Sequence, residues 1–256
     1  MNYPKENQLN NSNNNKCDNL YPVDWGTDLI IGVTIKNKHS FPPYGLSLAK
    51  AQILTDEECE NERIAFATSI GSNLQALKFQ HQVHGSEIMR INFNSGVQES
   101  DGLITNERGI QLCALLADCC GILLYDEHNH AIGSIHSGWK GTHQRISVNA
   151  VNAMKLEFGT RPEKLKAYLS PCASGEIYEV EKDVADLFRI GITKLNNTKY
   201  LFDNRSAIYD QLIMECGLLA HNITVSKECS IRDTRFHSFR RDGKSSGRMA
   251  AFIGLR

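Results

Sequence analysis

The feature that most constrains the fold is a series of short apolar segments in the middle of the chain, several of which end in polar residues and glycine. Short runs of alternating or continuous apolar residues predict β-strands rather than helices. We expect strands at residues 77–83, 102–105, 121–125, 131–135, 165–169 and 250–255. Helical patterns predominate on either side of this region. The sequence therefore predicts a mixed α/β (α+β) fold in which helices wrap central sheets.

Four helices are expected from capping signals and from apolar residues at helical spacing. Residues 55–58, Thr-Asp-Glu-Glu, form a capping box, and the helix that follows should end near Gly71. Three more helices should end at Gly159, Gly191 and Gly217. Their apolar faces comprise Ile146, Ala150, Met154 and Phe158, then Val180, Val184, Leu187 and Phe188, then Ile208, Leu212, Ile213 and Cys216.

The domain organisation follows from length and from the even composition of most of the chain. A length of 256 residues allows one or two domains. Residues 7–19 are mostly Asn and cannot bury apolar surface, so we expect a disordered N-terminal segment over residues 1–20. The rest contains neither a linker nor a repeat, which predicts a single catalytic domain over residues 21–256.

Charge and hydropathy exclude several classes of protein. The net charge of −1 argues against a general nucleic-acid binder, which is usually basic. No run of 18 apolar residues is present to span a membrane, and the first 20 residues lack the apolar core of a secretory signal. We therefore expect a cytosolic protein that binds neither nucleic acid nor membrane, as a monomer or a small homo-oligomer.

The chain has eight cysteines, and their spacing argues against a disulfide scaffold. They are scattered through a long chain without a Cys-x-x-Cys motif, and the expected compartment is reducing. We therefore expect one cysteine to be chemically active and the others to be small packing residues.

Three polar segments that follow apolar runs contain the residue types of a metal site. They are Gln-Val-His-Gly at 82–85, Ala-Asp-Cys-Cys at 117–120 and His-Ser-Gly-Trp-Lys-Gly at 136–141. His84, Cys119 and His136 would supply two imidazoles and a thiolate, which suit zinc and leave a fourth position open, as in catalytic sites. Their separations, 119−84 = 35 and 136−119 = 17 residues, are typical of ligands on separate strands.

Simpler interpretations of the same residues remain open. A histidine beside a glycine is often only a surface residue, and other histidines of this chain could be ligands instead. Cys120 should point away from Cys119 if the segment is extended, so the pair cannot easily supply two ligands to one metal. Asp118 either orients a metal ligand or caps a turn.

A basic segment near the C-terminus is the one charge anomaly. Residues 232–248 hold five Arg and one Lys against two Asp, a net charge of 6−2 = +4. Arginine forks bind phosphate or carboxylate in a bidentate manner, so Arg240 and Arg241 are candidate phosphate ligands, with Arg63 as a further one. The alternatives are a solvated basic loop and an ordinary surface arginine.

Seven segments, taken in order, resemble one protein family. They lie at residues 61–63, 82–85, 101–105, 117–119, 136–141, 178–180 and 239–248. Together they are similar to the multicopper polyphenol oxidase (laccase)-like, or YfiH/YlmD-like, family, whose members are described as purine nucleoside phosphorylases. The resemblance implies a CNF/YfiH-like single domain, related to deamidating toxin domains, and a zinc site at His84, Cys119 and His136. It also implies anion binding by Arg63 and the Arg240/Arg241 region.

The chain departs from the family pattern in the loops rather than at the ligands. The family's HAGWRG segment reads HSGWKG at residues 136–141, and the segments at 44–48 and 170–177 also differ. The expected metal ligands are retained, whereas loops that would line a substrate pocket are changed.

The resemblance and the residue chemistry together predict a zinc-dependent purine nucleoside phosphorylase. Its substrates would be phosphate and inosine, adenosine or methylthioadenosine, and adenosine deamination would be a second activity of the same metal site. One alternative is a copper-dependent polyphenol oxidase, because two His and one Cys also bind copper. Another is a hydrolase of a peptidoglycan precursor with Cys119 as nucleophile and His136 as base. A third is a non-catalytic protein with structural zinc and a partner-binding basic loop.

Overall fold

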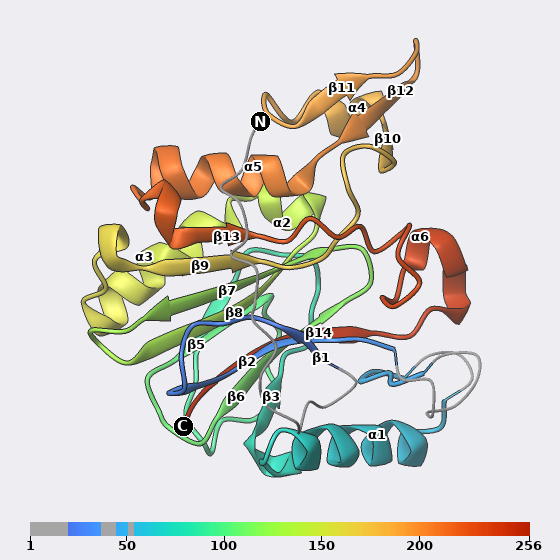
Figure 1. Cartoon of the computed structure of the whole chain (residues 1–256). Helices are drawn as coiled ribbons and strands as arrows, with labels where there is room; N and C mark the ends of the chain where they lie inside the picture. The colour runs from blue at the N-terminus through green and yellow to red at the C-terminus, as the bar shows by residue number, and fades with distance from the viewer. Residues whose placement is uncertain (1–19, 37–44, 51–53) are drawn as a thin grey trace.

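The computed structural model describes residues 20–36, 45–50 and 54–256. Its strands form two large sheets and one small sheet (Figure 1). The first large sheet has five strands in the order β1-β2-β14-β6-β3. These strands are β1 (Leu20–Pro22), β2 (Leu29–Thr34), β14 (Met249–Leu255), β6 (Gln111–Leu116) and β3 (Leu77–Phe79).

The second large sheet has six strands in the order β13-β9-β7-β8-β5-β4. These are β13 (Ile223–Val225), β9 (Lys166–Leu169), β7 (Cys120–Asp126), β8 (Ala131–Ser137), β5 (Gly102–Thr105) and β4 (Ile88–Arg90). Strands β7 and β8 form an antiparallel hairpin that pairs Cys120 with Ser137 and Gly121 with His136. This register brings the end of β8 beside the start of β7.

The small sheet consists of β10 (Glu179–Glu181), β12 (Lys199–Phe202) and β11 (Ile192–Lys194). It lies with α4 (Lys182–Ala185) at one end of the molecule (Figure 1). Phe202, Val180, Ala185 and Ala207 form its own small apolar cluster, against which Trp139 packs. The small sheet is thereby joined to the segment that follows β8.

The remaining helices flank the two large sheets. They are α1 (Asp56–Ser69), α2 (Trp139–His143), α3 (Ile146–Phe158), α5 (Asn204–Asp210) and α6 (Phe239–Asp242). A π-helical segment, η3 (Gln211–Glu215), continues α5. Short 3-10 turns are η1 (Leu74–Ala76), η2 (Pro162–Lys164), η4 (Ala220–Asn222) and η5 (Gly243–Ser245).

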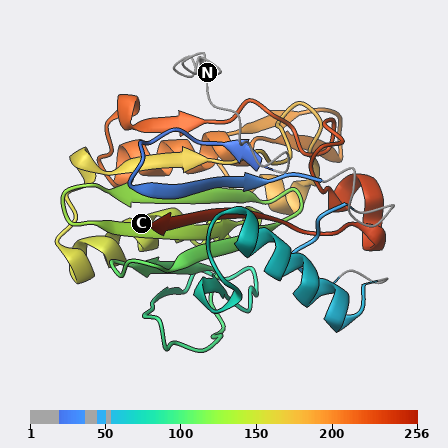
Figure 2. The ribbon, with the colours of Figure 1, turned by 60° about the horizontal axis from the view of Figure 1, so that its bottom comes forward.

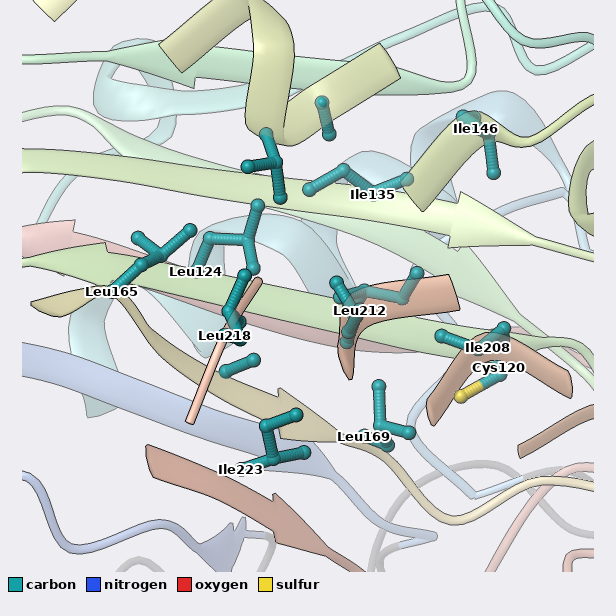
Figure 3. Close-up of a cluster of buried hydrophobic side chains, with 14 of the residues drawn as sticks. Cys120, Leu124, Ile135, Ile146, Leu165, Leu169, Ile208, Leu212, Leu218 and Ile223 are labelled. Atoms are coloured by element: carbon teal, nitrogen blue, oxygen red, sulfur yellow. The ribbon is translucent and has the colours of Figure 1, made fainter. Parts of the chain in front are cut away.

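Three apolar clusters hold these layers together. Leu112, Leu123 and Ile253 belong to the cluster between the two large sheets. On the outer face of the six-stranded sheet, α3, α5 and η3 cover a second cluster, part of which is drawn in Figure 3. On the outer face of the five-stranded sheet, α1 covers a third cluster (Figure 2), in which the rings of Phe66 and Phe252 lie 5.0 Å apart.

The local signals explain most helix boundaries. Thr55 and Glu58 form the predicted capping box at the start of α1, through a hydrogen bond from Glu58 N to Thr55 Oγ1 and one from Thr55 N to the Glu58 carboxylate. Gly159 ends α3 in the left-handed conformation, with φ of 70°. The predicted helices at 55–71, at 145–158 and around 208–216 are confirmed.

The predicted helix that carries Val180, Val184, Leu187 and Phe188 is wrong except for one turn around Val184. Val180 lies in β10, where it pairs with Tyr200 of β12, and the helix that follows is the four-residue α4. A strand partner about 20 residues further along the chain outweighs the helical spacing, as tertiary pairing often does. The predicted strand at 77–83 is also shorter, because β3 ends at Phe79.

The mixed α/β architecture is confirmed, with helices on the outer faces of central sheets. Residues 1–19 of the segment expected to be disordered lie outside the described residues, and Leu20 begins β1. No helix in the described part of the chain is both long enough and apolar enough to cross a membrane.

Candidate metal centre

His84 lies in the turn between β3 and β4 and has an unusual backbone conformation. Its φ is 59°, a left-handed conformation that costs energy for a residue with a side chain. One carboxylate holds this turn, because the backbone N–H groups of Val83, His84 and Gly85 all donate to Asp101, at 3.1, 3.1 and 2.7 Å. Three converging hydrogen bonds offset the backbone strain and fix the position of His84.

His136 is near the end of β8 and is bound by the same carboxylate. Its Nδ1 lies 2.7 Å from Asp101 Oδ1, and its backbone N–H donates to the Asp101 carbonyl at 2.7 Å. Burial favours the neutral form of Asp101, but the hydrogen bonds from His136 and the turn outweigh burial and lower the pKa of this carboxyl. Asp101 is therefore a carboxylate, His136 carries a proton on Nδ1, and Nε2 of His136 is left for another partner.

Cys119 ends the turn between β6 and β7, and its side chain faces opposite to that of Cys120. Cys120 belongs to the cluster under α3 and α5, whereas Cys119 packs against the cluster between the sheets. The preceding residue, Asp118, has φ of 85°. Its carboxylate accepts hydrogen bonds from Ser230 Oγ at 2.7 Å and from the backbone N–H of Arg240 at 2.6 Å. Asp118 therefore positions the C-terminal loop. The carboxylate that orients a candidate metal ligand is that of Asp101 instead.

The structure brings His84, Cys119 and His136 together. One nitrogen or sulfur atom of each lies within 4.8 Å of the others, and the two imidazole rings are 4.7 Å apart at a steep angle of 77°. In the described part of the chain this is the one group of three or more His, Cys, Asp or Glu residues that has metal-binding geometry.

Two further features fit a metal at this cluster. The carboxylate on Nδ1 of His136 is the common outer partner of a metal-bound imidazole. Gly138 leaves the space beside the ligands open: a Cβ there would lie 3.0 Å from Cys119 Sγ and 3.1 Å from His84 Nδ1. Two imidazoles and one thiolate are a donor set for zinc or copper.

The electrostatics of Cys119 and His136 are coupled. Burial opposes the thiolate, but the two histidines outweigh it and lower the pKa of Cys119. Burial also opposes the imidazolium, but Cys119 and Asp101 outweigh it and raise the pKa of His136. The cluster therefore stabilises a thiolate, which is the form that binds metals and attacks electrophiles.

The cluster lines a cavity of about 630 Å³, a size typical of small-molecule sites. Three cationic side chains line the same cavity, and each lies near the face of an aromatic ring. Lys140 is 5.5 Å from the Trp139 ring, Arg240 is 5.0 Å from Tyr178, and Arg248 is 5.8 Å from Phe239. The cavity thus combines candidate metal ligands, cationic side chains and aromatic surfaces.

Of the predicted arginines, the structure places only Arg240 in this cavity. The guanidinium of Arg241 donates to the carbonyls of Ser230, Ile231 and Phe236, which makes it a clamp for the loop. Arg63 lies on α1, where Nε donates to the Leu48 carbonyl at 2.8 Å and the guanidinium stacks on Phe79. Arg63 lines a different cavity, so Arg63 and Arg241 have local partners away from the metal ligands.

Sequence reasoning gave no role to several residues of the site, among them Asp101, Arg248 and Gly138. Asp101 and Arg248 belong to segments that the family resemblance includes, but neither has a pattern that assigns it a role. A side chain at position 138 would crowd Cys119 and His84, which are distant from it in sequence, so this requirement for glycine is visible only in the structure. An Asp-Gly at 101–102, at the start of the expected strand 102–105, is the one local signal that could have drawn attention to Asp101.

The chain is similar to one protein family over most of its length. A family model described as "Multi-copper polyphenol oxidoreductase laccase" matches residues 36–256. "Purine nucleoside phosphorylase YlmD" of Bacillus subtilis is 26% identical over 249 residues, covering 90% of this chain and 89% of that protein. A "Purine nucleoside phosphorylase" of Deinococcus radiodurans is 35% identical over 196 residues, covering 75% and 76%.

Solved structures share the fold. A hypothetical protein YfiH from Bacillus licheniformis has a TM-score of 0.82 and 26% identity, covering 89% of this chain and 93% of its own. YlmD from Geobacillus stearothermophilus has a TM-score of 0.85 at 24% identity, covering 93% and 99%. The mixed α/β arrangement of this chain is thus an established one.

Proposed function

The chain belongs to the family described as multi-copper polyphenol oxidoreductase laccase, and we propose that it is a zinc-dependent purine nucleoside phosphorylase. The observation that carries the proposal is the composition of one cavity. The His84–Cys119–His136 cluster, arginine side chains and aromatic rings line the same volume of about 630 Å³. Relatives named purine nucleoside phosphorylase, 26% and 35% identical to this chain, support the same activity.

Zinc would be held by Sγ of Cys119, Nε2 of His136 and a ring nitrogen of His84. When bound, zinc supplies a Lewis acid that polarises a substrate oxygen or lowers the pKa of a water molecule. The support for zinc over copper is chemical, since phosphorolysis moves no electrons to an acceptor and needs no redox metal. Asp101 would keep the His136 imidazole in the tautomer that presents Nε2.

The cations would bind phosphate and orient it. Arg240 offers a guanidinium fork at the cavity wall, and Lys140 adds an ammonium group. Arg248 adds positive charge beside them, although its Nη1 already donates to the Ser246 and Gly247 carbonyls. A phosphate oxygen then attacks the anomeric carbon of the ribose, a C–O bond forms, and the bond to the purine nitrogen breaks with its electron pair moving to the base. Fixed positive charge around the phosphate lowers the barrier for this displacement because it requires no rearrangement during the reaction.

The aromatic rings would bind the purine, and Tyr178 would assist its departure. Trp139 and Phe239 present ring faces on which a flat base can stack. Burial raises the pKa of the Tyr178 hydroxyl, so this group stays protonated. A neutral hydroxyl in the cavity can donate a hydrogen bond to the base as negative charge develops on it.

Incubation of the purified protein with inosine or adenosine, with and without phosphate, tests the proposal. Base release and ribose 1-phosphate formation only with phosphate are expected, together with zinc in the isolated protein. Cys119→Ser should lower both the zinc content and the turnover by at least about tenfold. Ammonia release from adenosine would assign deamination as a second activity of this site. Absence of phosphorolysis in zinc-loaded protein would refute the central proposal.

The second candidate is a cysteine hydrolase, and one relationship favours it. Cys119, His136 and Asp101 form a chain of thiolate, imidazole and carboxylate, the arrangement that activates a nucleophile in cysteine hydrolases. Amide hydrolysis that persists after zinc is removed and stops on alkylation of Cys119 would establish it. Oxidation of a phenol by the copper-loaded protein is the corresponding assay for the oxidase that the family description names.

The place of the protein in the cell is part of the proposal. The seven cysteines in the described part of the chain are free thiols, which is in keeping with a reducing compartment such as the cytosol. Purine nucleosides and phosphate would be its partners there, as a monomer or a small homo-oligomer.

A further inference from the structure

Gln80 is a polar residue of the cavity wall that has no partner. It follows β3, it is 5% exposed, and it lines the same cavity as the metal cluster. Neither Nε2 nor Oε1 of its amide has a hydrogen-bond partner in the structure. A buried amide without partners is destabilising, since it loses its hydrogen bonds to water and gains none in return.

Gln82, two residues further along, shows that an amide here can be satisfied by the protein. Its Nε2 donates to the Leu115 carbonyl at 2.9 Å, and its Oε1 accepts from the Leu115 backbone N–H at 2.8 Å. Gln82 lines the same cavity, so the two glutamines differ in their partners and not in their general location. The unused hydrogen-bonding capacity of Gln80 therefore requires a different explanation, and its place beside the cavity points to a ligand.

We propose that the carboxamide of Gln80 recognises the polar edge of the purine base. This inference rests on the proposed function and adds the residue that would set base preference. A glutamine amide offers a donor and an acceptor side by side, which matches the amino group and ring nitrogen of adenine in a bidentate manner. A half-turn of the same amide matches the carbonyl oxygen and N–H of hypoxanthine.

The surroundings of the cavity leave this role to few other groups. Trp139 and Phe239 offer ring faces, which bind a base from above or below, and Arg240 offers only donors. The Tyr178 hydroxyl is already assigned to the negative charge that develops on the leaving base. Gln82 has committed its amide to Leu115. Gln80 supplies an uncommitted acceptor together with a donor, so it accepts both adenosine and inosine and disfavours bases without a group at position 6.

The stability of two matched variants tests whether the amide is kept for a ligand. Gln80→Met replaces an unpartnered amide by an apolar chain of similar length, and the melting temperature of the ligand-free protein should rise by about 2–4 °C. Gln82→Met, the control, removes two hydrogen bonds to Leu115, and its melting temperature should fall. A fall in the Gln80→Met variant would mean that Gln80 belongs to a structural network, and would overturn the proposal.

Substrate discrimination supplies the second readout. With phosphate, Gln80→Met should lower kcat/KM for inosine and adenosine by roughly tenfold, and by only about threefold for purine riboside, which lacks the 6-substituent. Equal losses on all three nucleosides would overturn the role of Gln80 while leaving phosphorolysis intact. A wild-type protein that cleaves none of them would instead refute the proposed function, so the two failures are distinguishable.

Discussion

The Asp101 carboxylate lies 2.7 Å from Nδ1 of His136 and also accepts the backbone N–H groups of the His84 turn. Two of the three candidate ligands therefore share one positioning residue, although they are 136−84 = 52 residues apart in sequence. The relationship makes the geometry of the candidate metal site depend on a side chain that is not itself a member of the cluster.

Asp101→Asn should weaken metal binding by about 10- to 100-fold. The amide can present only one acceptor oxygen to donors that now occupy two, and its NH₂ group would favour the wrong tautomer of His136. Competition of the protein with a chelator for zinc measures the affinity. Asp118→Asn is the matched control, because that carboxylate holds Ser230 and Arg240 instead. Equal zinc affinities for the two variants would contradict the assignment.

Gly138→Ala should reduce metal affinity with little effect on folding. The new Cβ would lie 3.0 Å from Cys119 Sγ and 3.1 Å from His84 Nδ1, so one ligand must move by a few tenths of an ångström. The zinc content after dialysis and the melting temperature of the metal-free protein separate the two effects. Gly96→Ala, where a Cβ meets no atom within 4 Å, provides the control. Full zinc retention by Gly138→Ala would show that the site adapts to the methyl group.

The neighbouring arginines 240 and 241 should give opposite results. Arg240→Ala should raise KM for phosphate by about tenfold or more, because its guanidinium lines the cavity while only its backbone holds the loop. Arg241→Ala should lower the melting temperature instead, since it leaves the carbonyls of Ser230, Ile231 and Phe236 without their donor. Steady-state kinetics with varied phosphate and thermal unfolding of both variants measure the difference. An unchanged KM for phosphate in Arg240→Ala would contradict this role and favour the alternative interpretation, in which the basic segment is a solvated loop.

His237 should make the fold sensitive to mild acid. Burial lowers the pKa of His237 to about 4, and the nearby cations Lys36 and Arg248 lower it further, whereas the hydrogen bond between its Nε2 and the Leu46 carbonyl opposes this shift. An unfolded histidine titrates near 6.5, so below that pH the unfolded chain binds a proton that the folded chain does not. Stability should therefore fall as pH falls from about 6.5 to about 4, by about 2 kcal/mol at pH 5 from this residue.

Urea unfolding at pH 7.5 and pH 5 checks this expectation, with metal content held equal. His237→Gln keeps a donor for the Leu46 carbonyl and cannot be protonated, so its stability should change less between the two pH values than that of the parent. An identical change in both proteins would assign the acid sensitivity to other groups.

The sequence was sufficient for the elements whose signals are local. The capping box at Thr55 and the glycine at 159 define helix ends through neighbouring residues alone, and the apolar run at 121–125 forms a central strand. The prediction of a helix at Val180 was wrong because its strand partner, Tyr200, is too far along the chain for a helical or hairpin pattern to reveal the pairing. Strand β6 was not anticipated at all, although it is buried between β14 and β3.

The residues of the candidate site likewise fall into those that the sequence could identify and those that only the structure identifies. Residue types were enough to select His84, Cys119 and His136, because few side chains bind metals and turns after strands expose them. The choice among the three candidate arginines was not possible from sequence, since the surroundings of a guanidinium are set by tertiary structure. Arg241 donates to backbone carbonyls, Arg63 stacks on Phe79, and Arg240 lines the cavity. The same applies to Gln80 and Gln82, which have the same side chain and different partners.

The opposite orientations of Cys119 and Cys120 have a consequence for insertions and deletions. One sulfur lies at the cavity and the next lies in the core under α5, so the direction of the chain as it enters β7 decides which of the two cysteines becomes reactive. Deletion of Asp118 would move Cys120 toward the position of Cys119 without changing the number of cysteines. Such a chain would still have a cysteine beside His136, but the sulfur of Cys120 would no longer fill its place in the core. The deletion would therefore lower the stability of the fold and leave the number of metal ligands unchanged.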